Sequence, residues 1–538
     1  MFGFFFSSPP NLARNFLSLR FISELKYFFL CTHFSFETTR SPNMICVSVG
    51  RGRHKMMIAE HQHLAENGAE LVELRLDYIR RAVNLKRLLT DRPCPVIATC
   101  RRKEDGGRWE GSEADRVMLL RAAIVEGVEY VDLEWDIADK IPRYGSTLRI
   151  VSYHNFDETP DDIEEIHHKM TKLDPDIIKI TTTANNPIDN FKVLRLVRDS
   201  NIPTAGFCMG SMGMTSRILC GKYGSPLTYA TFSSDRKMAP GQLSFNKMKK
   251  AFRYDEISEK TTILGVIADP VAHSFSPLIH NALIRKMGLD MLYLPFRVPK
   301  EHLKDFLEAC PEMGIKGLSV TIPHKESCLK CINVLDDDVA GIRACNTIVF
   351  DGINAFGYNT DCSAAVETLE EAITEKYPDE DPFEGREFML LGAGGVARAI
   401  AFSLVRKKAK VIITARNPKK AEALSDWLKC DMIPWEERGQ NEPSVLVNCT
   451  PVGMHPKMDE TPFDVKWLEK KTIVFDTIYN PERTLLIKEA REFGCTVVTG
   501  VDMFVRQAAK QVKFFTGQDP VLEDVRYELK RATSAAKY

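Results

Sequence analysis

Asp176-Ile177-Ile178-Lys179-Ile180 is a short apolar run interrupted by a single lysine. A strand of a parallel sheet is buried on both faces, so an amine within it loses its hydration. Desolvation disfavours the ammonium form, and a neutral amine can condense with a carbonyl as a Schiff base. In the alternative interpretation, Lys179 reaches water at a strand end or pairs with a carboxylate. The pentapeptide alone leaves both interpretations open.

Other apolar runs precede and follow this one, and amphipathic stretches of about one helix separate them. With 176–180 there are eight runs: 45–49, 71–76, 95–99, 130–133, 148–152, 176–180, 202–208 and 227–232. Strands that alternate with helices pair in parallel, and about eight units in roughly 200 to 250 residues are typical of a (β/α)8 TIM barrel. An open doubly wound sheet is the alternative.

Polar residues fall at the ends of these expected strands, where barrels of this class place their active sites. They are Glu73 and Arg75 in the second run, Arg101 after the third, His154 after the fifth, Lys179 in the sixth and Arg217 after the seventh. Each alone is ordinary, since a single histidine is usually structural and Arg–Asp pairs often stabilise folds. Together they predict an active site at one rim.

Residues 44–245 resemble type I 3-dehydroquinate dehydratases. The matching stretches are 73–77 (ELRLD), 152–156 (SYHNF) with Thr159-Pro160, 177–180 (IIKI), Met209-Gly210 with Ser216-Arg217, and 239–242 (APGQ). The resemblance implies that Lys179 forms an imine with the substrate ketone and that His154 acts as base and then acid. It implies that Arg217 holds the carboxylate. The residues that it assigns to the ring hydroxyls and the lid are Ser48, Glu73, Arg75, Arg101 and Gln242.

This chain departs from the dehydratase pattern at two positions. Asp105 stands where the family commonly has a glutamate that orients the histidine, and the missing methylene shortens its reach by about 1.5 Å. Either the loop compensates or Glu104 takes the role. Met238 replaces the serine that usually precedes the lid motif, so one substrate-binding hydroxyl is lost. We expect lower dehydratase efficiency with unchanged chemistry.

A second set of polar positions begins after the next expected strand, 262–268. Ser274 and Ser276 are separated by one residue in a turn. This spacing puts both hydroxyls on one side, where they can bind a carboxylate, although such turns more often cap a helix. Lys325 follows the run 319–322, and Asp361 lies further along the chain. A lysine and an aspartate brought together can share a proton transfer, and an ordinary salt bridge is the alternative.

The run 388–399 (FMLLGAGGVARA) takes a strand through a glycine turn into a helix. This order places a pyrophosphate at a helix N-terminus, as in Rossmann domains. The next strand, 410–415, ends at Arg416, and an arginine there accommodates the 2′-phosphate of NADP, whereas an acid would bind the ribose of NAD. The sequence therefore predicts NADP(H) as the cofactor.

Residues 261–538 resemble shikimate dehydrogenases, with further matches at 448–454 (NCTPVGM), 476–481 (DTIYNP) and 500–507 (GVDMFVRQ). The resemblance implies a catalytic pair of Lys325 and Asp361, with Ser274, Ser276 and Tyr479 at the substrate carboxylate. It places Thr321, Asn346 and Gln507 at the ring hydroxyls. Around Arg416 the family's usual Asn-Arg-Thr is Ala415-Arg416-Asn417. The implied cofactor-binding residues are Gly392, Ala393, Gly394, Gly395, Val396, Arg416, Asn417 and Gly500.

These matches divide the chain into an unassigned extension (1–43), a dehydratase barrel (44–245), a charged linker with a short helix (246–260) and a two-domain α/β dehydrogenase. The dehydrogenase comprises a substrate-binding domain (261–362), a Rossmann NADP-binding domain (363–500) and C-terminal helices that return to the substrate-binding domain (501–538). The extension is rich in Phe, Ser and Arg and has only Glu24 and Glu37 as acids. We expect a cytoplasmic protein with an over-extended start, and the alternative is a transit peptide that would direct the protein to a plastid.

Composition narrows the class of ligand. A formal net charge of -1 gives no basic footprint for nucleic acid or an anionic membrane, and no apolar run approaches the 18 or so residues of a membrane span. The 14 cysteines are scattered, and the close pair Cys328 and Cys331 lacks a second pair to complete a metal site. We therefore expect small-molecule substrates, reduced thiols and no metal.

The two resemblances describe consecutive reactions. We expect one half to dehydrate 3-dehydroquinate and the other to reduce 3-dehydroshikimate to shikimate with NADPH. A quinate-preferring dehydrogenase is one alternative, which Ser276 and Thr321 disfavour because they crowd the carbon that carries the extra hydroxyl. The other is a non-catalytic sensor of pathway intermediates, which has no need for Lys179, His154, Lys325 and Asp361.

Overall fold

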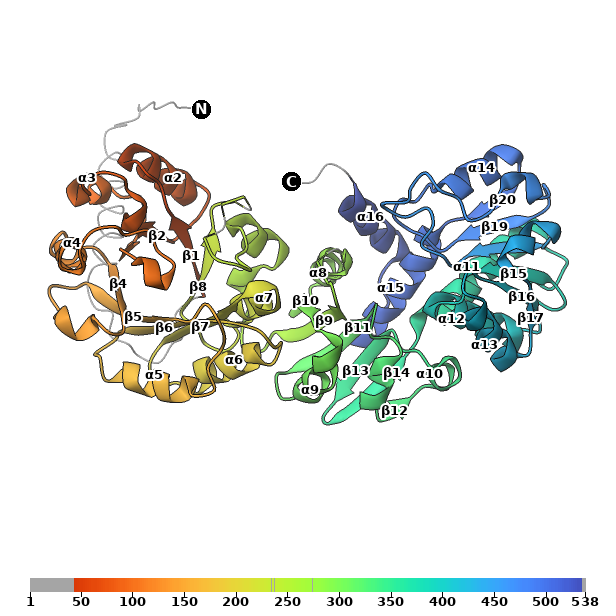
Figure 1. The fold of residues 1–538 in the computed structure, drawn as a ribbon, viewed down its shortest axis with the longest axis horizontal. Coiled ribbons are helices and arrows are strands. Elements are labelled where there is room, and N and C mark those ends of the chain that lie inside the picture. The colour runs from red at the N-terminus through yellow and green to blue at the C-terminus, as the bar shows by residue number, and fades with distance from the viewer. Residues whose placement is uncertain (1–42, 234, 237, 273, 535–538) are drawn as a thin grey trace, which may run out of the picture. The chain divides into compact units, whose positions relative to one another are not determined.

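The computed structural model describes residues 43–233, 235–236, 238–272 and 274–534 of the 538 (Figure 1). The predicted extension, 1–43, therefore lies outside the described residues except for Asn43. The side-chain amide of Asn43 donates a hydrogen bond to the Ile257 carbonyl at 2.6 Å. The first described strand begins one residue later, at Met44.

The N-terminal part is an eight-stranded parallel sheet in the order β7-β6-β5-β4-β3-β2-β1-β8, and it forms a nearly closed barrel. All eight expected runs are strands, with ends that differ from the prediction by at most three residues. The strands are β1 (Met44–Val49), β2 (Leu71–Arg75), β3 (Val96–Thr99), β4 (Tyr130–Glu134), β5 (Leu148–His154), β6 (Ile177–Thr183), β7 (Thr204–Met209) and β8 (Leu227–Thr231).

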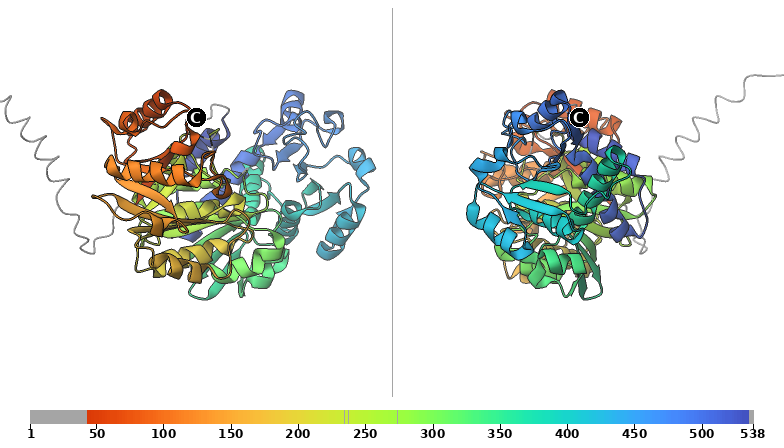
Figure 2. Two further views of the ribbon diagram at one scale, coloured as in Figure 1. Left: turned by 60° about the vertical axis from the view of Figure 1, so that its left-hand side comes forward. Right: turned by 90° about the vertical axis from the view of Figure 1, so that its right-hand side faces the viewer.

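Helices connect and surround these strands (Figures 1 and 2). They are α2 (His54–Glu66), α3 (Leu85–Leu89), α4 (Glu113–Val125), α5 (Ile163–Thr171), α6 (Asp189–Asp199) and α7 (Gly210–Leu219). Hydrogen-bonded caps fix two of their starts: the side chain of Asn84 accepts from Arg87 N before α3, and that of Ser112 accepts from Asp115 N before α4. The predicted TIM barrel is confirmed, and the open sheet is excluded.

The two-residue period of the strands separates two environments inside the barrel. Cys46, Ile97, Ile150 and Ile177 belong to one buried apolar cluster. Two residues further along their strands stand Ser48, Thr99, Ser152 and Lys179, all buried and all polar. Because side chains two apart share one face of a strand, this second level lines the same interior nearer the strands' C-terminal ends.

The segment expected as a short helix and linker packs closely. It contains a π-helical turn at Lys247–Ala251 and a 3₁₀ turn at Tyr254–Glu256, with Met248, Phe252 and Tyr254 buried. The Tyr254 hydroxyl lies 3.5 Å from Cys220 Sγ of the barrel. This stretch therefore contributes to the core despite its many charges.

The next part has a mixed sheet in the order β10-β9-β11-β13-β14-β12. Its strands are β9 (Thr262–Ala268), β10 (Met291–Arg297), β11 (Ile315–Val320), β12 (Val334–Leu335), β13 (Thr347–Asp351) and β14 (Asn354–Tyr358), and its helices are α8 (Ser276–Lys286), α9 (Leu303–Ala309) and α10 (Asp337–Ile342). Strands β9, β10 and β11 are parallel, whereas β13 is antiparallel to both β11 and β14.

The third sheet is wholly parallel, in the order β17-β16-β15-β18-β19-β20, which is the 3-2-1-4-5-6 order of a Rossmann domain. Phe388 and Leu390 face one buried cluster, and Met389 and Leu391 face another, so both faces are covered. Its strands are β15 (Glu387–Leu391), β16 (Lys410–Thr414), β17 (Asp431–Met432), β18 (Val445–Asn448), β19 (Ile473–Asp476) and β20 (Thr496–Val498). Its helices are α11 (Thr360–Lys376), α12 (Gly395–Arg406), α13 (Pro418–Leu428) and α14 (Leu485–Phe493).

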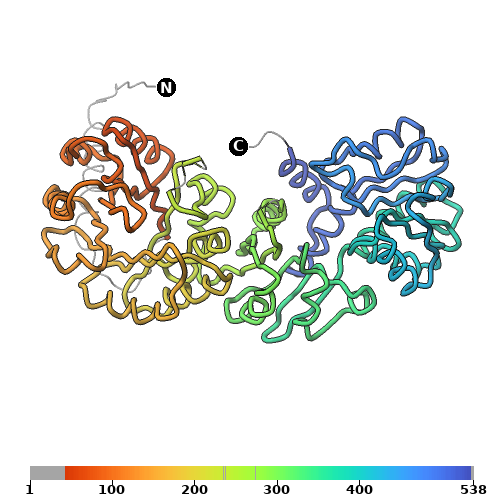
Figure 3. The backbone as a smooth tube through the Cα atoms, viewed as in Figure 1, coloured from red at the N-terminus to blue at the C-terminus, as the bar shows by residue number. Residues whose placement is uncertain are grey.

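The chain then returns through α15 (Gly500–Thr516) and α16 (Leu522–Thr533) to the elements around the mixed sheet (Figure 3). Val505 and Val512 of α15 share a buried cluster with Ile279 of α8 and Leu529 of α16. Gln511 of α15 donates to the Asn346 carbonyl at 3.1 Å and to Thr347 Oγ1 at 3.0 Å. These contacts make the C-terminal helices part of the same folded unit as the mixed sheet.

Candidate active sites

Lys179 lies in the middle of β6 with a buried side chain. Its Nζ is 2.9 Å from Asp132 Oδ2 and 3.8 Å from Glu73 Oε1, and it lies 4.1 Å from the centre of the Tyr229 ring. The structure therefore contains a part of each interpretation: Lys179 is buried, and it pairs with a carboxylate. A buried amine held by a single short ion pair is fixed in position, as a nucleophile requires.

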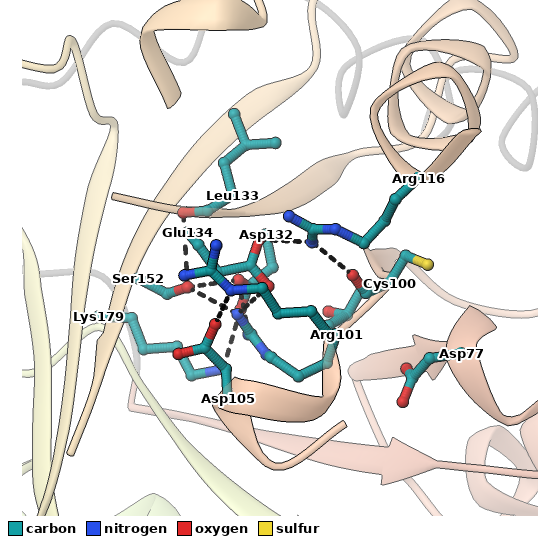
Figure 4. A network of polar contacts seen from close by, with 12 residues as sticks. Asp77, Cys100, Arg101, Asp105, Arg116, Asp132, Leu133, Glu134, Ser152 and Lys179 are labelled. Carbon is teal, nitrogen blue, oxygen red and sulfur yellow. Dashed lines mark hydrogen bonds and ion pairs between the residues drawn. The ribbon is translucent and has the colours of Figure 1, made fainter. Parts of the chain in front are cut away.

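Asp132 on β4 joins this lysine to a buried polar network (Figure 4). Its Oδ1 accepts from Arg101 Nη2 at 2.7 Å and from Ser152 Oγ at 2.7 Å. Burial opposes ionisation of Asp132, but the charges of Arg101 and Lys179 outweigh it and hold the pKa of Asp132 well below its usual range. Asp132 is therefore a permanent anion inside the barrel.

His154 ends β5 at the same rim, and its Nδ1 is buried without a hydrogen-bond partner. Burial, and then the positive charges of Arg101 and Lys179, lower its pKa well below 6.5. The ring of Phe156 stacks on it at 6.3 Å. His154 is consequently a neutral imidazole, able to accept a proton.

Arg217 on α7 is buried, and its Nε and Nη2 have no partner in the described residues. Burial lowers its pKa to about 10, so it stays charged at neutral pH. Its guanidinium lies 4.6 Å from the centre of the Phe207 ring. A buried cation with two free donors fits an anionic ligand such as a carboxylate.

The other expected dehydratase residues mostly pair with protein groups. Ser48 Oγ donates to Glu73 Oε2 at 2.6 Å, and Thr99 Oγ1 donates to Glu73 Oε1 at 2.9 Å. Arg75 makes a two-bond pair with Asp77 at 2.9 and 2.8 Å. Gln242 is buried, and its Oε1 accepts from Met238 N at 2.8 Å, which closes the turn around 239–242.

Asp105 and Met238, which depart from the dehydratase pattern, both contact arginines. Asp105 pairs with Arg102 Nε, and Arg102 makes a second pair with Asp136 at 2.7 Å. Neither His154 nitrogen has a hydrogen bond to Asp105 among the described contacts. Met238 Sδ lies 3.9 Å from Arg75 Nη1, so a thioether stands beside this guanidinium.

In the second half, Lys325 Nζ donates to Asp361 Oδ2 at 2.5 Å. Lys325 lies in the loop after β11, and Asp361 is in the first turn of α11, where Asn359 caps the helix. The Lys325 carbonyl accepts from Cys345 N at 2.7 Å, which fixes this loop. The predicted lysine–aspartate pair is therefore formed.

The expected substrate residues of this half lie on several elements. Ser276 N donates to Ser274 Oγ at 3.3 Å at the start of α8, and Tyr479 packs on Phe504 with ring centres 4.5 Å apart. Asn346 is buried: its Nδ2 donates to Thr360 Oγ1 at 3.0 Å, and its Oδ1 accepts from Thr360 N at 2.9 Å. Thr321 follows β11, and Gln507 lies on α15, both half-buried.

The glycine turn between β15 and α12 leaves room for a ligand. Gly392 has φ 114°, which favours glycine, and a Cβ added to Gly394 or Gly395 would meet no atom within 4 Å. Ala393 and Val396 are half-buried beside it. Gly500 has no such room, because its Cβ would lie 2.4 Å from the Ile478 carbonyl group.

Arg416 and Asn417 follow β16 and are exposed. The Asn417 side chain accepts from Lys420 N and so caps α13. This helix cap gives Asn417 a structural role whether or not it also contacts a cofactor.

Sequence reasoning missed Asp132, Glu134 and Arg116. Glu134 accepts from Arg101 Nη1 at 2.8 Å and from Arg116 Nη1 at 2.7 Å. The side chains of these three residues and of Asp132 are all buried. The signal was present, since Asp132 and Glu134 alternate with Val131 and Leu133 and must share one face of their strand.

The second half contains a similar missed group. Ser319 Oγ donates to Gln511 Oε1 at 2.9 Å and accepts from Tyr293 at 2.7 Å, so a buried chain of polar groups links β10, β11 and α15. No spacing in the sequence pointed to it.

Three family models match the chain. One described as type I 3-dehydroquinase matches residues 45–259, and one described as the shikimate dehydrogenase substrate binding domain matches 266–348. A third, described as NADP oxidoreductase, coenzyme F420-dependent, matches 387–477, within the Rossmann sheet.

Named relatives cover either the whole chain or its second half. A chloroplastic bifunctional 3-dehydroquinate dehydratase/shikimate dehydrogenase of Arabidopsis thaliana is 33% identical, covering 90% of this chain and 83% of the relative. A shikimate dehydrogenase (NADP(+)) of Methanothermobacter thermautotrophicus is 37% identical, covering 51% of this chain and 98% of the relative. The crystal structure of a Thermus thermophilus shikimate 5-dehydrogenase with NADP(H) and shikimate has 29% identity and a TM-score of 0.45, covering 50% of this chain and 99% of that one.

Two kinds of feature are absent from the described residues. None of the helices there is both long and apolar enough to cross a membrane. Nor do His, Cys, Asp and Glu side chains in those ranges gather in a group of three or more that could hold a metal ion.

Proposed function

This chain belongs to the family of bifunctional 3-dehydroquinate dehydratases/shikimate dehydrogenases, and we propose here which of its residues carry each reaction. The barrel dehydrates 3-dehydroquinate to 3-dehydroshikimate, and the second half reduces this product to shikimate with NADPH. The proposed boundaries of these units are 44–245 for the barrel, 246–260 for the connecting segment, 261–362 and 501–538 for the substrate side, and 363–500 for the nucleotide side.

In the dehydratase, Lys179 attacks the ketone and forms an imine, which draws electrons from the neighbouring C–H bond. His154, kept neutral by burial, removes that proton and then protonates the departing hydroxyl. Arg217 binds the carboxylate through its free Nε and Nη2. Ser48, Glu73, Arg75, Arg101 and Gln242 hold the hydroxyls and the lid.

In the dehydrogenase, Lys325 donates a proton to the carbonyl oxygen while Asp361, at 2.5 Å, orients the ammonium group. Ser274, Ser276 and Tyr479 bind the carboxylate. Thr321, Asn346 and Gln507 bind the ring hydroxyls, and Asn346 is already fixed by Thr360. We favour shikimate over quinate as the substrate, because Ser276 and Thr321 in these roles would crowd the carbon that carries the extra hydroxyl of quinate.

NADP(H) supplies the hydride when it is bound. The open space at Gly394 and Gly395 and the start of α12 fit a pyrophosphate. Gly392, Ala393, Val396 and Gly500 are assigned to the same cofactor site, and Arg416 and Asn417 would contact the adenosine 2′-phosphate.

For the location in the cell, the name of the Arabidopsis relative and the composition of residues 1–43 favour a plastid over the cytoplasm. Fusion of residues 1–43 to a fluorescent protein tests this proposal, because import into isolated chloroplasts with cleavage is expected. A fusion that stays outside the organelle intact would favour the cytoplasm.

The observation that carries the dehydratase assignment is a buried lysine paired with Asp132 near a half-buried histidine whose pKa is lowered and whose Nδ1 is buried. The test is to incubate the purified protein with 3-dehydroquinate and NADPH while enone absorbance and NADPH loss are followed together. We expect enone to appear without NADPH and to be consumed when NADPH is added. Enone formation without NADPH consumption would remove the dehydrogenase assignment, and the absence of enone would remove the dehydratase assignment.

A further inference from the structure

The buried carboxylate of Asp132 has a position that none of the assigned roles uses. Its side chain has no exposed surface, and its Oδ2 touches Lys179 Nζ at 2.9 Å. Its Oδ1 is occupied by Arg101 and Ser152 at 2.7 Å each. One oxygen is therefore anchored to the protein and the other is directed at the reacting nitrogen, as Figure 4 shows.

We propose that Asp132 is the counter-ion of the Lys179 nitrogen throughout dehydration, neutralising first the ammonium and then the iminium. This inference rests on the proposed Schiff-base role of Lys179. It makes Asp132 a further catalytic residue, because it touches an atom whose bonds change.

The charge balance of imine formation supports one counter-ion for both states. An ammonium group and a ketone give an iminium and one water: a C=N bond replaces the C=O bond, and two of the three nitrogen protons leave with the oxygen. The nitrogen keeps one proton and its positive charge. An anion that neutralises the ammonium therefore faces the same charge in the iminium, and the remaining N–H can donate to Oδ2.

The other groups around the nitrogen serve this purpose less well. Glu73 on β2 is 3.8 Å away, and both its oxygens accept from Ser48 and Thr99. Arg101, two residues after the end of β3, and His154, at the end of β5, are also near the nitrogen, and neither is an anion. Cys46 on β1 and Tyr229 on β8 complete the surroundings, and burial raises the pKa of both, so they are neutral.

Asp132→Asn tests the proposal because the amide keeps the shape of the side chain and removes its charge. Its Nδ2 would face the nitrogen and disfavour a positive charge there. We expect dehydration to slow by roughly 10²- to 10³-fold. Labelling of Lys179 by 3-dehydroquinate and sodium cyanoborohydride, read as the mass of the Lys179 peptide, should weaken, and the pH of half-maximal labelling should fall by about 1 to 3 units.

Glu134→Gln is the matched control. Glu134 is as buried, lies on the same strand and also binds Arg101, but it does not contact Lys179. This variant should leave the labelling pH unchanged, whatever its effect on stability. Ser152→Ala is a second probe. It removes one of the hydrogen bonds that anchor Asp132 but leaves the charge of Asp132 in place, so dehydration should slow several-fold without a shift of the labelling pH.

The outcomes separate the two proposals. If wild-type Lys179 is not labelled, the Schiff-base role itself is wrong. If wild-type protein is labelled and Asp132→Asn shows the same labelling pH, or if Glu134→Gln shifts it equally, Asp132 is not the counter-ion. Should Asp132→Asn fail to fold by circular dichroism, Ser152→Ala decides, since unchanged dehydration in that variant contradicts the proposal.

Discussion

The two lysines proposed for catalysis have different surroundings. Lys179 lies within a strand, with 6% of its side chain exposed, and faces two carboxylates. Lys325 lies in a loop, with 20% exposed, and faces one. A nucleophile must be held rigidly away from water, whereas a proton donor must be recharged from solvent after each turnover. The surroundings of Lys179 and Lys325 therefore suit the different tasks that we propose for them.

Lys179→Ala should have the largest effect, because no other buried amine lies on β6. Dehydration should fall below detection, and the mass increase after borohydride trapping should vanish from the corresponding peptide. Reduction of 3-dehydroshikimate in the same protein is the internal control and should persist. Undiminished dehydration in this variant would show that the buried lysine is structural.

Lys325→Ala should slow shikimate oxidation with NADP by roughly 10²- to 10⁴-fold, the range for loss of a general acid or base. Dehydration of 3-dehydroquinate should continue at the wild-type rate. If either lysine variant silenced both reactions in folded protein, the two sites would not be independent, and the comparison between them would lose its basis.

Arg416→Ala should affect only the dehydrogenase. Loss of a charged contact to a phosphate costs about 1.5 to 3 kcal/mol, which is roughly ten- to a hundredfold in affinity for NADPH. Affinity for NADH should hardly change, and titration of both cofactors measures this. Arg491, exposed on α14 of the same domain, is the control position for a similar loss of charge. Equal losses for both cofactors would show that Arg416 does not read the 2′-phosphate.

The pH dependence of dehydration should show the smallest effect. Because burial and two cations depress the pKa of His154, the imidazole stays neutral as the pH falls through 6.5. The base is lost only below that range, so His154 should add no step to the kcat/KM profile between pH 7 and 5.5, where an ordinary histidine would fall to about one-tenth neutral. An acid limb centred near pH 6.5 would mean that His154 is more exposed to solvent than the structure shows.

The sequence predicted the strands well because buried parallel strands are continuous apolar runs between polar helices. Lys179, His154 and Lys325 were found for the same reason, since each interrupts or follows such a run. Asp132 was not found, because it contacts Lys179 across β5, and only the strand order brings β4 and β6 that close. Asp105 shows the same limit. Its position in the sequence suggested that its carboxylate orients His154, but in the folded loop this carboxylate pairs with Arg102.

The return of α15 to the mixed sheet has a consequence for protein synthesis. The last strand of that sheet ends at Tyr358, yet the helix that bonds Asn346 and Thr347 ends at Thr516. At roughly 5 to 20 residues per second, the ribosome needs about 8 to 32 s to deliver it. The barrel, complete much earlier in the chain, can fold while translation continues. During that interval Ile279 and Leu283 of α8 lack the two helices that cover them in the folded chain, so an apolar surface stays exposed until synthesis is nearly finished.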